Sequence, residues 1–281
     1  MEVLSQGSII TGIRNKKYEG IECNGIVITA RCDLVPGREK VDKVYFLIAL
    51  ELKDWLLSDI GWKTIVKNKV NSVRRLLSEK LRGFSLDWDT ISDYSIDEFQ
   101  TVICDTENCI PGSDQKELQK SFKEYLSYLH PSTKEKIDYY CKNNSYLKEA
   151  LSFLFNGNDT HFSFISSKSY GNFSESFPGL IVDHQELFFF SFDLAKAIEK
   201  NEIDEKNNQL SSEKIEEYND LFYLRDGTGF STILHRIQSP WIEYLTQRFS
   251  STFARIGVDN PDKQDVIKIV DRIIKEWGEK R

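Results

Sequence analysis

The sequence predicts an α+β protein in which strands and helices occupy separate stretches of the chain. Residues 1–58 hold short apolar, β-branched runs, residues 59–156 show helical periodicity, and strand patterns return after residue 157. We therefore expect a small barrel-like β unit over 1–58, a mainly helical region over 59–156, and a β-ribbon capped by C-terminal helices over 157–281. A chain of 281 residues is long enough for two modest domains or for one integrated domain.

The N-terminal strands are expected at Ser8–Ile13, Ile21–Ala30 and Val41–Leu52, with a turn at Pro36-Gly37 between the last two. Cys32 and Asp33 follow the second strand. A thiol and a carboxylate there have two interpretations. In the first, Cys32 acts as a nucleophile and its thiol pKa is lowered. In the second, the pair stabilises the end of the strand, with Asp33 accepting hydrogen bonds from backbone N–H groups of the turn. No histidine lies at a spacing that implies pairing with Cys32.

The middle of the chain is expected to be helical. Apolar residues recur at helical spacing over 61–83, Ser113 is a candidate N-cap, and Ser132-Thr-Lys-Glu135 predicts a capping box. Residues 156–160 then break the pattern. Beyond them we expect a strand at Phe162–Ser166 and an antiparallel ribbon of Leu180–Val182 with Leu187–Phe192, turning at Asp183-His184.

A second strand pair is expected at Phe222–Leu224 with Thr232–Ile237. Two helices close the chain, opened by Ser239-Pro240 and Asn260-Pro261.

Composition excludes some classes of function. No basic and apolar leader is evident at the N-terminus and no apolar run approaches membrane-spanning length, so we expect no membrane partner. The five scattered cysteines favour reduced thiols and a cytoplasmic protein. A net charge of −7 argues against polyanion binding by the chain as a whole.

The segment 61–83 is the exception, because it carries seven basic residues against Glu79 alone. Five of them fall within one arc of about 120° on the predicted helix, away from its apolar stripe. They are Lys63, Lys67, Arg74, Arg75 and Arg82. Such an arc suits a phosphate backbone or an acidic protein surface. The alternative is a solvated helix face that offsets acidic neighbours in the same chain.

Three further groups are candidate sites. Cys104 and Cys109 bracket a loop that holds Asp105 and Glu107, a spacing that offers Zn²⁺ one thiol pair but lacks the second pair usual in structural sites. Asp42, followed by a strand and then by Glu51 and Lys53, approximates the Asp…Glu-x-Lys layout in which carboxylates hold Mg²⁺ for nucleic-acid cleavage. The alternatives are plain loop thiols and an ordinary charged strand end.

The third group is basic. Arg248 and Arg255 lie seven residues apart on one predicted helix face, near His235 and Arg236, and can bind phosphate or carboxylate. The alternative is packing against the acidic segment 195–219.

Two segments carry a resemblance. Both ends of the chain are similar to a widespread group of uncharacterised bacterial proteins. At the N-terminal end the similarity covers Gln6-Gly-Ser-Ile-Ile10 and Ile26-Val-Ile-Thr-Ala-Arg-Cys-Asp-Leu34. At the C-terminal end it covers Leu234-His-Arg-Ile-Gln-Ser-Pro-Trp241 and its continuation to Gly257. In that group a Gln-Gly-Asp-Ile strand opens the chain and a later strand ends in Thr-Gln-Thr-Cys-Asp-Leu. This chain departs from the pattern at Ser8 and at Ala30-Arg31. The opening also resembles PemK/MazF-like toxins, small SH3-like barrels that cleave RNA.

These observations lead to one expected function and one rival. The resemblance implies an accessory component of a bacterial defence or toxin–antitoxin module, which binds a partner protein or a nucleic acid and needs no cofactor. The rival is a nuclease, either metal-dependent with Mg²⁺ or Zn²⁺, or MazF-like.

Overall fold

The computed structural model describes residues 4–34, 42–105, 110–155, 161–166, 179–191, 233–254 and 263–279. They divide into two units. The first combines described residues of 1–58 with those of 144–281, and the second spans Asp59–Asn143. The protein is a mixture of helices and antiparallel strands, as the sequence predicts, with the N-terminal strands in the sheet.

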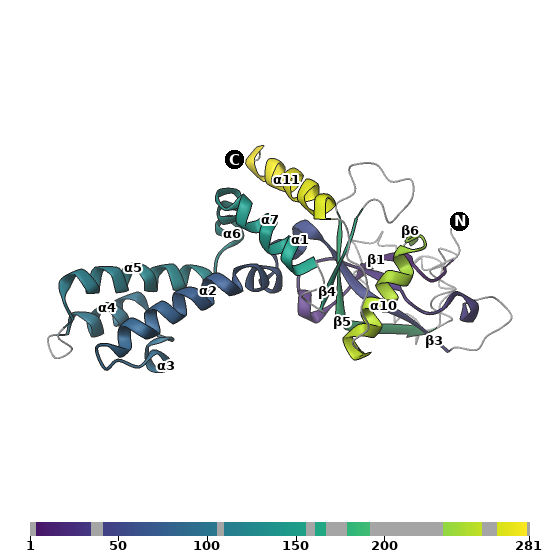
Figure 1. Cartoon of the computed structure of the whole chain (residues 1–281). Coiled ribbons are helices and arrows are strands. Elements are labelled where there is room, and N and C mark those ends of the chain that lie inside the picture. The colour runs from purple at the N-terminus through teal and green to yellow at the C-terminus, as the bar shows by residue number, and fades with distance from the viewer. Residues whose placement is uncertain are drawn as a thin grey trace, which may run out of the picture. The chain divides into compact units, whose positions relative to one another are not determined.

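The first unit is built on one antiparallel sheet, whose described strands have the order β4-β5-β3-β2-β1-β6 (Figure 1). The strands are β1 (Ser8–Ile13), β2 (Cys23–Val27), β3 (Lys43–Glu51), β4 (Phe162–Ile165), β5 (Leu180–Ser191) and β6 (Ile233–Arg236). Short 3₁₀ turns follow β1 and β2, namely η1 (Lys16–Tyr18) and η2 (Arg31–Asp33). The predicted strands at 8–13, 21–30 and 41–52 are therefore confirmed, with the second and third somewhat shorter than expected.

Alternation along the strands gives the sheet two apolar faces. On one face the register aligns Ile9 with Ile26 and Ile26 with Leu47, and all three are buried. Ile242 and Leu245 of α10 (Trp241–Ala254) pack into the same cluster. On the opposite face Trp55 of α1 (Leu52–Leu57) packs edge-on against Phe162. The helices α7 (Asn144–Phe153) and α11 (Lys263–Glu279) contact each other, and Lys148 pairs with Asp271 between them.

The predicted hairpin within 180–192 is wrong. β5 is one strand that runs along β3, and its register shifts between Leu47 and Ile48 so that Leu187 and Asp183 face consecutive β3 residues. Residues 184–186 have no partner in β3 and form an irregular bulge of three residues. The polar pair Asp183-His184, which looked like a turn, is buried in the sheet because both side chains have hydrogen-bond partners there.

The second unit is a group of helices: α2 (Asp59–Arg82), α3 (Trp88–Ile91), α4 (Ile96–Cys104), α5 (Gly112–Leu129) and α6 (Thr133–Lys142). α2 and α5 lie side by side (Figure 1). The helix predicted over 61–83 is confirmed as α2. The capping box is also confirmed, because Ser132 caps α6 and the Glu135 carboxylate accepts from the Ser132 backbone. Ser113 is not an N-cap, since α5 begins at Gly112 after Pro111.

Candidate functional site: a pocket that holds two arginines

Three segments that are distant in sequence meet at one end of the sheet of the first unit. The Gly7 N–H donates to the Val27 carbonyl (2.8 Å), and the Ile237 N–H donates to the Gly7 carbonyl (2.9 Å). The Gln6 side-chain amide donates to the Ile28 carbonyl (3.4 Å). The exit of β2, the entry to β1 and the exit of β6 are therefore joined by hydrogen bonds that involve Gln6 and Gly7.

Gly7 has to be a glycine for this junction to form. Its φ is +87°, in the left-handed region, and a Cβ on it would lie 2.8 Å from the Ile237 carbonyl oxygen. Any side chain would therefore push β6 away from β1 at the point where β1 begins and β6 ends.

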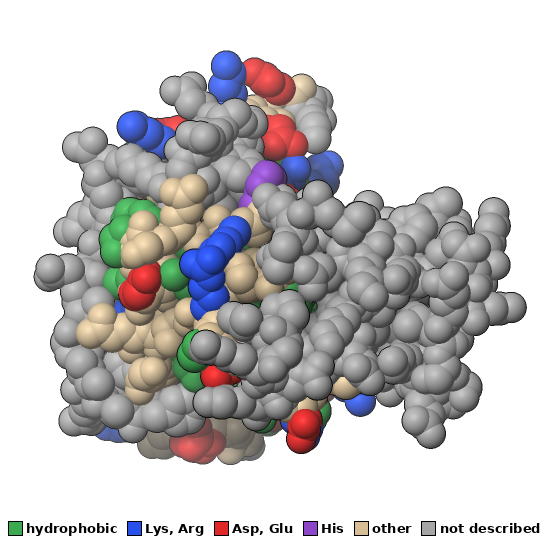
Figure 2. Space-filling view, turned by 90° about the vertical axis from the view of Figure 1, so that its right-hand side faces the viewer, with side chains coloured by type: hydrophobic (Ala, Val, Ile, Leu, Met, Phe, Trp, Pro, Cys, Tyr) green, Lys and Arg blue, Asp and Glu red, His purple; other side chains and the backbone are tan. Residues whose placement is uncertain are grey.

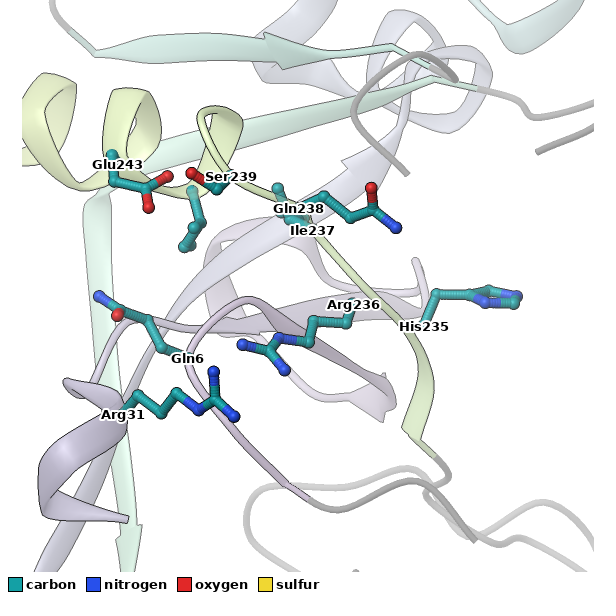
Figure 3. Close-up of a pocket in the computed structure, with 9 residues that line it drawn as sticks. Gln6, Arg31, His235, Arg236, Ile237, Gln238, Ser239 and Glu243 are labelled. Carbon is teal, nitrogen blue, oxygen red and sulfur yellow. The ribbon is translucent and has the colours of Figure 1, made fainter. Parts of the chain in front are cut away.

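The junction forms one wall of a pocket of about 470 Å³. Its lining residues are Gln6, Arg31, His235, Arg236, Ile237, Gln238, Ser239, Ile242 and Glu243. Figure 3 shows the guanidinium groups of Arg31 and Arg236 pointing toward one another, while His235 points away from them. Figure 2, a view of the side where α10 and β6 lie, shows basic side chains at the surface with acidic and hydrophobic ones beside them.

The two arginines are placed by different elements. Arg31 opens η2, four residues after the last residue of β2, and Arg236 is the last residue of β6, paired with Ser8 of β1. Both side chains are exposed. Neither forms an ion pair within 4.0 Å with a residue that the structure describes. Two adjacent cations without a carboxylate partner create a positive field that favours an anion.

A second polar group is buried between β5 and η1. Asp183 is fully buried and accepts from Tyr18 Oη (2.6 Å), Lys17 Nζ (2.8 Å) and the Gln185 N–H (2.9 Å). Lys17 also lies 3.4 Å from a Glu186 oxygen. Burial, with the Asp183 carboxylate next in effect, raises the pKa of Tyr18, so its hydroxyl stays protonated as a donor.

On the other side of the same bulge His184 shares a 2.6 Å hydrogen bond with Ser163. Both side chains are buried. Burial, and then the Arg248 guanidinium, lowers the pKa of His184 to about 4, so the ring is neutral at pH 7. A Ser–His pair that is closed to solvent cannot reach a substrate. We assign it a structural role.

Cys32 and Asp33 lie in η2 with their side chains adjacent, Sγ to Oδ1 at 3.6 Å, and Cys32 is exposed. No described histidine is hydrogen-bonded to Cys32. The turn at Pro36-Gly37, to which Asp33 was expected to bind, lies outside the described residues.

Asp42 and Glu51 are not brought together. Asp42 precedes the first residue of β3 and Glu51 is its last residue. At about 3.3 Å per residue, nine steps of extended strand separate them by roughly 30 Å. Lys53 pairs with Glu276 of α11 (2.7 Å). Desolvation and the neighbouring Asp54 carboxylate raise the pKa of Glu51.

Arg248 was predicted to present its guanidinium to an anion at the surface. This prediction is wrong, because Arg248 is buried near His184. Arg255, its expected companion, lies outside the described residues, as do Cys109 and Glu107 of the expected zinc loop. Cys104 is exposed and its Sγ lies 3.6 Å from Gln115 Oε1. Within the described ranges no cluster of three His, Cys, Asp or Glu side chains is arranged to hold a metal ion.

The predicted basic arc on α2 is present and points outward. Its members Lys63, Lys67, Arg74, Arg75 and Arg82 are all exposed. Arg74 and Arg75 form long ion pairs with Asp89 (3.6 Å) and Glu79 (3.8 Å). For the other three, no carboxylate of the described chain lies within 4.0 Å.

Sequence reasoning missed that Arg31 and Arg236 share a pocket, and it missed the Asp183 group. A carboxylate within the apolar run Leu180–His184 was a usable signal for the second, because a charge there needs a buried partner.

Among the described helices, none has both the length and the apolar character needed to cross a bilayer. No protein-family model, curated protein or solved structure matches this chain.

Proposed function

We propose that the protein is an accessory binding component that contacts the phosphate backbone of a nucleic acid through the basic face of α2. Such a role fits the defence or toxin-type module implied by the resemblance. The observation that carries the proposal is the exposure of all five arc residues, three of them with no ion pair to a described residue.

The charge density and the geometry of the α2 face support binding to the phosphate backbone of a nucleic acid. Lys63, Lys67 and Arg74 follow one another along the helix at intervals of four and seven residues, so they lie in a row. The ion pairs of Arg74 and Arg75 involve exposed groups at long distances, and pairs of this kind contribute little stability. A phosphate backbone can replace them at small cost.

The nuclease rival gains no support from the predicted carboxylates. Asp42 and Glu51 lie at opposite ends of β3, so they cannot share one metal ion. Tests of Glu51 for cleavage are therefore secondary to tests of binding.

The decisive experiment compares two triple variants of the full chain by fluorescence anisotropy with labelled DNA and RNA duplexes. The test variant is Lys63→Gln, Lys67→Gln, Arg82→Gln. The matched control is Lys116→Gln, Lys120→Gln, Lys123→Gln, which removes three exposed lysines from α5 of the same unit. The test variant should lose about tenfold or more in affinity at low salt, and its salt slope should fall by about 0.9 per lost phosphate contact.

Equal affinities and salt slopes for the two variants would refute the proposal. Loss of affinity for an acidic protein but not for either duplex would also refute it, because it would assign the face to a protein partner.

A further inference from the structure

The pocket beyond the ends of β2 and β6 offers a second binding site that is independent of α2. The geometry points to a pocket for a nucleoside phosphate, with the phosphate held between Arg31 and Arg236. The ligand is a phosphate monoester carried by a nucleoside, either as a free nucleotide or as the phosphorylated 5′ end of a strand.

A phosphate fits the two guanidinium groups better than a carboxylate does. They converge in the pocket (Figure 3) and together carry two positive charges. A phosphate monoester carries between −1.5 and −2 near pH 7 and presents three acceptor oxygens, so it can accept from both arginines at once. A carboxylate has one charge and two oxygens, which a single arginine satisfies.

Backbone hydrogen bonds preorganise the pocket for an anion. Gly7 is hydrogen-bonded to both Val27 and Ile237, so the end of β2, which leads into η2 and Arg31, is fixed relative to the end of β6, which carries Arg236. The N-terminus of α10, whose first turn contributes Ile242 and Glu243 to the lining, adds the positive end of a helix dipole.

The rest of the pocket matches a nucleoside. About 470 Å³ lies within the range of small-molecule sites and exceeds what a phosphate group alone needs. Glu243 lies on the opposite side of the pocket from Arg31 (Figure 3). A carboxylate there repels a second anion but accepts hydrogen bonds from ribose hydroxyls or a base amino group. One end of the pocket is therefore suited to phosphate and the other to hydrogen-bond donors.

Isothermal titration of the full chain tests this assignment. The probes are ribonucleoside 5′-monophosphates, the corresponding nucleosides, and a short single strand with a 5′-phosphate or a 5′-hydroxyl. We expect a monophosphate or the 5′-phosphorylated strand to bind, and its unphosphorylated counterpart to bind at least about tenfold more weakly. Binding of the monophosphates identifies a free nucleotide, and binding of the phosphorylated strand alone identifies a strand end.

The variants Arg31→Gln and Arg236→Gln should each reduce that binding about tenfold or more, and Arg236→Lys should retain more affinity than Arg236→Gln. Arg14→Gln, an exposed arginine outside the pocket, is the control, and circular dichroism verifies that each variant folds.

The inference is overturned if no phosphorylated probe binds, or if folded Arg31→Gln and Arg236→Gln bind as tightly as the control. If the pocket binds the phosphate, the α2 variants leave the affinity for monophosphates unchanged. Failure of the pocket proposal is therefore distinguishable from failure of the proposed nucleic-acid binding by α2.

Discussion

Replacing Asp183 by Asn should destabilise the first unit by about 3 kcal/mol. The carboxylate is fully buried and accepts three hydrogen bonds, two of them from Lys17 and Tyr18 to the same oxygen. Asn keeps the size of the side chain and can still accept from Gln185, but it presents an amide group to the Lys17 ammonium. A hydrogen bond to a charged group contributes about 1.5–3 kcal/mol, and the bond to Tyr18 becomes one between neutral groups.

The estimate stays below the 3–5 kcal/mol typical of breaking a fully buried ion pair, because the Lys17 side chain is 27% exposed and can regain water. For a domain of this size, 3 kcal/mol corresponds to a decrease in Tm of roughly 6–12 °C.

Scanning calorimetry measures that decrease, and hydrogen exchange locates it. Exchange should accelerate in β3 and β5 and remain unchanged in α4 and α5, because Asp183 belongs to the first unit whereas α4 and α5 belong to the second. The matched control is Asp42→Asn, which removes an exposed carboxylate from the same unit. The reasoning is refuted if Asp183→Asn and Asp42→Asn differ by less than about 1 kcal/mol, since the buried bonds would then contribute no more than a surface charge.

Two other predictions concern stability. His184 has a pKa of about 4 in the folded protein, against 6.5 for the free side chain, so the unfolded chain takes up a proton first as the pH falls. The free energy of unfolding should therefore decline between pH 6.5 and pH 4, by up to about 3 kcal/mol, and be unaffected by this group above pH 6.5. Urea denaturation should show a shallower decline for His184→Gln, and parallel curves would contradict the assignment. Gly7→Ala should cost about 2–4 kcal/mol, because it adds a clash with Ile237 to the strain of a positive φ. Gly12→Ala is its control, since Gly12 has a φ of +76° but open space around it, and equal losses for the two variants would show that the close approach is unimportant.

Features that depend on neighbouring residues were predictable from the sequence. The apolar, β-branched run Ser8–Ile13 predicted the bounds of β1, and Ser132 with Glu135 predicted the start of α6. The basic arc of α2 followed from helical periodicity, because a surface helix exposes the side chains opposite its apolar stripe. Each of these patterns is complete within a few turns or one strand.

Features that depend on distant partners were predictable only in part: the charge of Asp183 within an apolar run signals a buried partner, but the sequence does not say which residue it is. Asp183 and His184 have the local character of a turn, and only Tyr18 and Lys17, far earlier in the chain, make burial of the carboxylate favourable. The pairing of β6 with β1 likewise brings Arg236 beside Arg31 from the other end of the sequence. The pocket is therefore not predictable from local patterns, because the two arginines on its sides lie about 200 residues apart in the sequence.

The position of β3 in the sheet has a consequence for biosynthesis. Its partner β5 begins about 130 residues after β3 ends, with the whole second unit encoded between them. At about 5–20 residues per second, a ribosome needs roughly 6–26 s to supply β5. During that interval one edge of a strand rich in Val, Phe, Leu and Ile has no partner, which is the condition under which nascent chains aggregate. We expect the nascent chain to depend on chaperones over this interval, while the helices of the second unit, whose contacts are more local, complete their folding first.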